Sequence, residues 1–140
     1  MRYALYIAAA LSLGSCTNGI DLDEVFYDSL LNDNNSKIWV VNSFVVDGVD
    51  VASPILVDKN IIVFHANKAV NMLPMRGIGS SNPKRGRYIL DSKNRELVID
   101  FGDSQWDLDI SYITEDSIYF STKKKVENKF GFQIIPFPEL

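Results

Sequence analysis

Residues 96–121, ELVIDFGDSQWDLDISYITEDSIYFS, give the clearest indication of the fold of this 140-residue chain. Apolar side chains recur here at every second position, and mostly polar side chains stand between them. The apolar positions are Leu97, Ile99, Phe101, Trp106, Leu108, Ile110, Tyr112, Ile118 and Phe120. Because successive side chains of a strand point to opposite faces, this period of two is typical of half-buried antiparallel strands. We therefore predict strands over residues 96–101, 106–113 and 117–121.

The same period continues on both sides of this stretch. Residues rich in β-branched and aromatic side chains predict further strands over 38–46, 61–64, 69–75, 87–90 and 130–135. Asp47-Gly48 lies between two valines and is the strongest hairpin signal. The strand that returns from this turn is short, and Pro54 indicates an edge or a bend. One helix is predicted over residues 21–31, where Asp21 can cap the first turn.

Eight or nine short strands in hairpin order predict a mainly β fold, a small antiparallel meander barrel of about eight strands with one short N-terminal helix. A barrel of this size is just wide enough for side chains to fill it, or to hold one small ligand. Several large side chains are candidates for the inside: Trp39, Phe64, Tyr88, Phe101, Trp106, Tyr112 and Phe120. Their combined volume predicts a filled interior.

The first sixteen residues have the layout of an export signal. Arg2 precedes an apolar run over residues 3–13, and Gly14-Ser15-Cys16 follows. The run is too short for a membrane helix, which needs about 20 residues. Residues 13–16 resemble the bacterial lipobox, which implies cleavage after Ser15 and lipid on Cys16. The alternative is an ordinary signal peptide that ends near a cysteine.

This resemblance divides the chain into a signal peptide (1–15), a lipidated tether (16–20) and a β domain (21–140). Thr17 is not the aspartate that retains lipoproteins at the enterobacterial inner membrane, so the expected location is the outer membrane, on its periplasmic or surface side. Cys16 is the only cysteine, and the chain therefore cannot form an internal disulfide.

The order of short motifs in residues 21–136 resembles that of the small lipocalin-like lipoproteins. The motifs are a short helix, Lys37-Ile38-Trp39, Asp47-Gly48, Gly86-Arg87-Tyr88 and the hairpin of residues 106–121. The resemblance implies a β-barrel that carries a small apolar ligand. Classical lipocalins have a glycine two residues before the tryptophan of the first strand, whereas this chain has Lys37. The departure counts against a classical ligand-binding calyx more than against the barrel.

Residue types that perform catalysis are sparse. His65 is the only histidine, it belongs to no motif, and a structural role is expected for it. Asp107 and Asp109 share a strand face at roughly 7 Å, within the range of paired glycosidase carboxylates, but they fit the wet face of an amphipathic strand better. We predict no catalytic, cofactor-binding or metal-binding residues.

Charges occur in blocks along the chain. The net charge is −4, and a mildly acidic domain is a poor candidate for binding nucleic acid. Residues 21–58 carry a charge of −7, residues 59–95 carry +7 and residues 96–116 carry −7. The blocks can pair across neighbouring strands, or they can orient the domain on a partner. The candidate protein-contact residues are Arg76, Lys84, Arg85, Arg87 and, in the C-terminal tail, Phe137.

These observations predict a lipid-anchored, non-enzymatic binding or accessory domain of the outer envelope that contacts another protein. The alternative is a carrier of a small apolar ligand, and a more distant one is an enzyme that uses surface carboxylates. A cavity inside the barrel would favour the carrier, and a filled interior the accessory role. A cluster of buried carboxylates would favour the enzyme.

Overall fold

The computed structural model describes residues 22–80 and 82–138. The described elements are α1 (Leu22–Asn32), β1 (Ser36–Val46), β2 (Val49–Asp50), η1 (Leu56–Asp58), β3 (Asn60–His65), β4 (Ala69–Pro74), η2 (Met75–Gly77), β5 (Lys84–Asp91), β6 (Glu96–Asp100), β7 (Gln105–Ile113), β8 (Ile118–Thr122) and β9 (Phe130–Pro136). The predicted signal peptide, tether and lipidated Cys16 lie outside the described residues.

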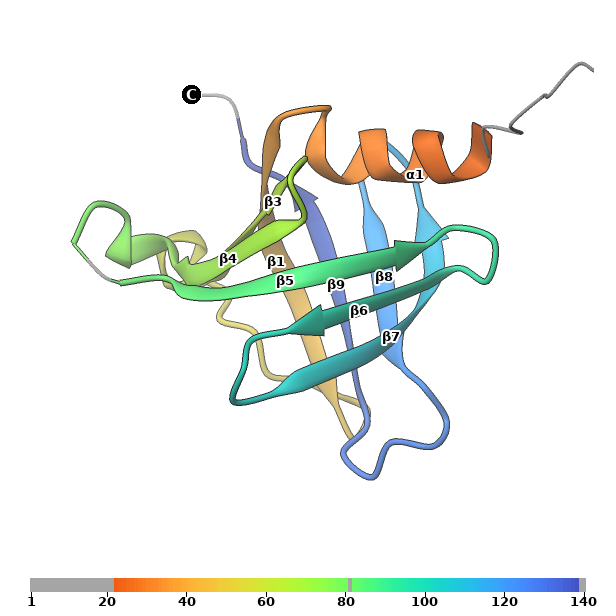
Figure 1. Cartoon of the computed structure of the whole chain (residues 1–140). Coiled ribbons are helices and arrows are strands. Elements are labelled where there is room, and N and C mark those ends of the chain that lie inside the picture. The colour runs from red at the N-terminus through yellow and green to blue at the C-terminus, as the bar shows by residue number, and fades with distance from the viewer. Residues whose placement is uncertain (1–21, 81, 139–140) are drawn as a thin grey trace, which may run out of the picture.

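The strands form an antiparallel meander that closes on itself (Figure 1). β1 pairs with β3, each strand from β3 to β8 pairs with the next one along the chain, and β9 pairs with β1. β1 and β3 to β9 thus make a closed barrel of eight strands, and β2 only extends the first hairpin. The predicted fold class, a small eight-strand barrel with one short helix, is confirmed.

Local sequence explains the first hairpin and the change of partner along β1. Asp47 and Gly48 both adopt positive φ, 51° and 79°, as a tight two-residue hairpin turn requires. β1 pairs with β3 over Ser36–Val40 and with β9 from Trp39 onward, with a register shift between Val41 and Ser43. β1 therefore leaves β3 half-way along its length and bends across the barrel.

The core confirms six of the seven large side chains that were expected inside. Five are buried, and Trp106 packs against them from a half-buried position. The expectation for Tyr112 was wrong, because this side chain is 54% exposed. A register shift between Ile110 and Tyr112 adds Ser111 as an extra residue on β7. Such a bulge reverses the alternation beyond it, so Tyr112 faces outward and Ile113 packs on the core.

Helix α1 covers one end of the barrel (Figure 1). Leu31 of this helix is buried against the barrel, and its carbonyl oxygen accepts a hydrogen bond from Trp39 Nε1 at 2.8 Å. Asn32 Nδ2 donates to the Tyr88 hydroxyl at 3.0 Å, and that hydroxyl donates to the His65 carbonyl oxygen at 2.8 Å. Burial raises the pKa of Tyr88 above its ordinary value. The end of the barrel nearest α1 is thus filled and hydrogen-bonded.

No helix in the part of the chain that the structure describes has the length and apolar character needed to cross a membrane.

Candidate functional site

A pocket of about 420 Å³ opens at the end of the barrel opposite α1. It lies where the second half of β1 has parted from β3, and residues 51–59 cross the resulting gap. We call residues 51–59 the crossing segment. Pro54 interrupts the strand pattern within it, and η1 forms its second half. The segment becomes one wall of the pocket instead of a barrel strand.

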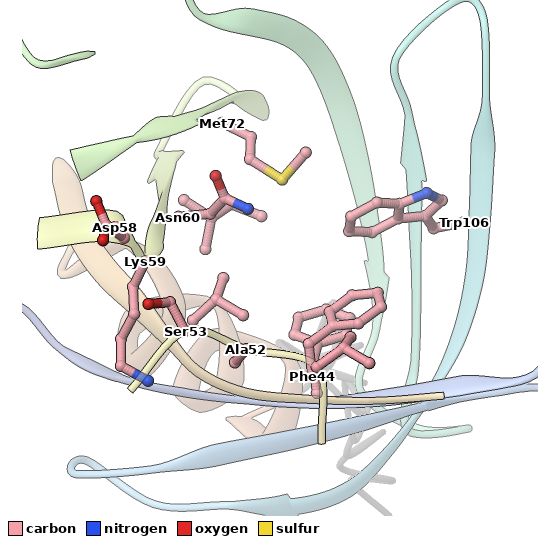
Figure 2. A pocket seen from close by; sticks show the side chains of 12 residues that line it. Phe44, Ala52, Ser53, Asp58, Lys59, Asn60, Met72 and Trp106 are labelled. Atoms are coloured by element: carbon pink, nitrogen blue, oxygen red, sulfur yellow. The ribbon is translucent and has the colours of Figure 1, made fainter. Parts of the chain in front are cut away.

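The inner wall of the pocket is apolar and aromatic (Figure 2). Its side chains are Val41, Phe44, Ile62, Met72, Trp106 and Phe132. Phe44 stacks on Phe132 with ring centroids 6.0 Å apart, and Trp106 meets Phe132 edge-on at 5.7 Å. In Figure 2, Met72 and Phe44 approach Trp106 from opposite sides and leave a space between the three side chains. This wall can bind an apolar group by contact and by excluding water.

The opposite wall is polar and belongs largely to the crossing segment (Figure 2). Ser53, Asp58, Lys59 and Asn60 line it. Lys59 Nζ donates to the Asn42 carbonyl oxygen at 2.5 Å, which satisfies a strand carbonyl that β3 no longer reaches. An ammonium group has three N–H donors, so Lys59 keeps donors for a ligand. The pocket therefore has an apolar side and a polar side.

Several contacts hold the crossing segment in place. At its start, Asp50 Oδ1 accepts the backbone N–H groups of Phe44 at 3.1 Å and Ala52 at 2.9 Å. These two hydrogen bonds lower the pKa of Asp50 below its ordinary value. At its end, Asp58 forms an ion pair with Arg76 of η2. The segment is attached to β1 on one side and to η2 on the other.

The structure does not bring the predicted basic cluster together. Arg76 pairs with Asp58, and Lys84 pairs with Asp103 at 3.1 Å and also donates to Ser104. The hydrogen bond from Lys84, with a second from Ser104 Oγ at 3.1 Å, lowers the pKa of Asp103. Arg85 and Arg87 are exposed on the outer face of β5. Two neighbouring bases on a strand must point to opposite faces, and this separates Lys84 from Arg85.

Phe137 does not project as a free anchor. Its side chain is half-buried, and its backbone N–H donates to the Ile38 carbonyl oxygen at 3.0 Å. The tail therefore continues the pairing between β9 and β1.

The histidine and the carboxylates take structural positions away from the pocket. His65 Nδ1 lies 2.6 Å from Ser36 Oγ, and its Nε2 lies 3.0 Å from Asn71 Nδ2. Asp107 and Asp109 are half-buried on the outer side of β7, where Gln105 Nε2 donates to Asp107 at 3.0 Å. Among the described side chains, no group of three or more metal-binding residue types lies close enough to hold a metal ion. None of these residues lines the pocket.

The pocket was missed from the sequence, although the chain carries one signal for it. Residues 51–57 are mostly apolar, yet they break the period of two and contain Pro54. Pro54 keeps this segment from forming a barrel strand, and its first residues, Val51, Ala52 and Ser53, line the pocket at the gap between β1 and β3.

Scanned against known protein families, the chain matches none, and a search of curated proteins found no similar sequence.

Proposed function

We propose that this chain is a lipid-anchored, non-enzymatic envelope protein that binds one small amphipathic molecule in the pocket at the open end of the barrel. The pocket supports this proposal, because it has an aromatic inner wall and a polar outer wall. Its volume of about 420 Å³ falls within the range of small-molecule sites. Ligand pockets are commonly mostly apolar with a few polar groups that fix orientation.

The chemistry of the two walls sets the class of ligand. The apolar part would lie among Phe44, Met72 and Trp106, where it removes aromatic surface from water. The polar end would face Lys59 and Asn60, which can donate hydrogen bonds. Lys59 forms no ion pair with a described carboxylate, although its charge helps to lower the pKa of Asp50, and Asp58 on the same wall is paired with Arg76. An anionic group on the ligand would therefore pair with Lys59. A medium-length carboxylic acid has this chemistry.

A carrier of a small ligand therefore takes precedence over the accessory role that the sequence favoured. The accessory role was predicted on the expectation of a filled interior, and that expectation holds only at the end covered by α1. The lipid anchor on Cys16 and the outer-membrane location remain proposals. They rest on the resemblance of residues 13–16 to the lipobox.

The test is to extract the purified protein with organic solvent and identify what is released by mass spectrometry. We expect an amphipathic molecule in about equimolar amount. Met72→Trp should abolish its recovery, because the larger ring enters the space between Phe44 and Trp106. Ile89→Trp is the matched control, since residue 89 is 70% exposed on β5 and the same ring is added outside the barrel. Equal recovery from the two folded variants, or none from the wild type after incubation with a medium-length fatty acid, would count against the proposal.

A further inference from the structure

The candidate ligand pocket is closed at its inner end. Five barrel strands line it: β1, β3, β4, β7 and β9. On each of them, the next inward-facing side chain beyond the pocket has no exposed surface and does not line the pocket. These side chains are Trp39, Phe64, Val70, Leu108 and Ile134. A filled layer of the core therefore lies directly below the pocket.

Exposure falls from the mouth of the pocket to its inner end. Three lining side chains are half-buried near the mouth: Phe44, Met72 and Trp106. Three others are 8% exposed or less, and we call them the pocket floor: Val41, Ile62 and Phe132. The floor offers no polar side-chain atom, so a carboxylate placed against it would lose its hydrogen bonds to water without compensation. A bound acid therefore points its apolar end at the floor.

Strand β3 gives the depth of the pocket. Asn60 of the polar wall and Ile62 of the floor are two residues apart on this strand and share a face, so about 7 Å separates them along it. Carbon–carbon bonds of about 1.5 Å advance an extended chain by about 1.3 Å per carbon. A chain whose carboxylate is held by Asn60 therefore meets the floor after about five carbons, and a few carbons later if the longer side chain of Lys59 holds it.

We propose that the pocket floor sets the length of the ligand's apolar chain, and that the site selects straight-chain carboxylic acids of about six to nine carbons. This inference rests on the proposed function, to which it adds the chain length that the site accepts. Ile62 is the residue that determines this limit on β3. It lines the pocket, whereas Trp39, its cross-strand partner on β1, already belongs to the filled layer below.

The limit has a measurable consequence, because buried and unburied methylenes contribute differently to affinity. Each methylene that the pocket removes from water strengthens binding about four-fold. A methylene beyond the limit cannot pass the floor without displacing side chains of a close-packed core. It therefore stays at the mouth of the pocket, in contact with water, and adds little to the affinity.

The test is isothermal titration of the full chain with straight-chain acids from butanoate to dodecanoate. Wild-type affinity should rise about four-fold per methylene and then level off near the predicted limit. Ile62→Ala opens an apolar cavity below the floor, which a chain end can fill, so its affinity should go on rising for about two further carbons. Ile118→Ala is the matched control and should keep the wild-type limit, because this isoleucine is equally buried at the start of β8 but does not line the pocket.

A milder variant keeps the test decisive if Ile62→Ala fails to fold. Ile62→Val removes a single methyl group and should extend the limit by about one carbon. Affinity that keeps rising through dodecanoate in the wild type, or an unchanged limit in the folded Ile62 variants, would overturn the inference and leave the proposed function standing. An equal extension in Ile118→Ala would overturn it as well. If no acid of any length binds the wild type, the proposed function fails and this inference fails with it.

Discussion

Replacing Tyr88 by phenylalanine removes a single oxygen atom where α1 meets the barrel. That oxygen accepts a hydrogen bond from Asn32 and donates one to the His65 carbonyl oxygen. Tyr88 and Asn32 are each only 1% exposed, so water cannot readily replace the lost partner of the Asn32 amide. A buried donor left without an acceptor costs about 1–3 kcal/mol. The His65 carbonyl is more accessible and adds less, so we expect Tyr88→Phe to lower the free energy of unfolding by about 2 kcal/mol.

Urea unfolding followed by circular dichroism measures this loss. With an m-value of about 2 kcal/mol per molar urea, the midpoint should fall by about 1 M. Tyr112→Phe is the control, because that side chain is 54% exposed and should change stability by less than about 0.5 kcal/mol. Equal midpoints for the two variants would show that the hydrogen bonds between α1 and the barrel make no net contribution to the free energy of unfolding.

Three further predictions concern the anchor, the first turn and the crossing segment. Cys16→Ser should abolish lipid attachment, so fractionation should find unprocessed precursor or shed soluble protein; a normally processed, membrane-bound variant would exclude the lipobox interpretation. Gly48→Val should lower stability by about 1 kcal/mol or more in urea unfolding, because φ is 79° there and β-branched residues resist positive φ; an unchanged midpoint would contradict the hairpin geometry. Two backbone hydrogen bonds lower the pKa of Asp50, so the ionised carboxylate stabilises the fold above the unfolded-state pKa, and this stabilisation is lost as pH falls through the lower folded-state pKa. Amide exchange at Ala52 should therefore accelerate at acid pH relative to its intrinsic rate. Asp50→Asn should remove that pH dependence.

The sequence predicted the barrel because strand periodicity and turn chemistry are local properties. Asp47-Gly48 determines its own hairpin, and the alternation around Leu108 determines which face is buried. The expected alternation of inward and outward side chains failed at Tyr112. One extra residue in β7 reverses which side chains point inward from that position on. No local pattern around Ser111 signals that bulge.

The candidate site was harder to predict because long-range pairing creates it. The pocket exists because β1 changes partner from β3 to β9, and that choice depends on residues far apart in the chain. Three of the four predicted basic residues lie within residues 84–87, but the strand pleat turns Lys84 away from Arg85. Arg76 and Lys84 pair with different carboxylates. Only the irregular apolar run around Pro54 indicated that residues 51–57 do not form a regular barrel strand.

The two tryptophans of the chain allow a direct measurement of whether a small amphipathic molecule binds between Phe44, Met72 and Trp106. Bromine quenches tryptophan fluorescence on contact. Trp106 lines the pocket, whereas Trp39 is fully buried beneath α1. Titration with a brominated medium-length fatty acid should quench part of the emission at a one-to-one ratio. In Trp106→Phe, where only Trp39 emits, that quenching should disappear. Saturable quenching of equal size in Trp106→Phe would instead place the ligand outside this pocket.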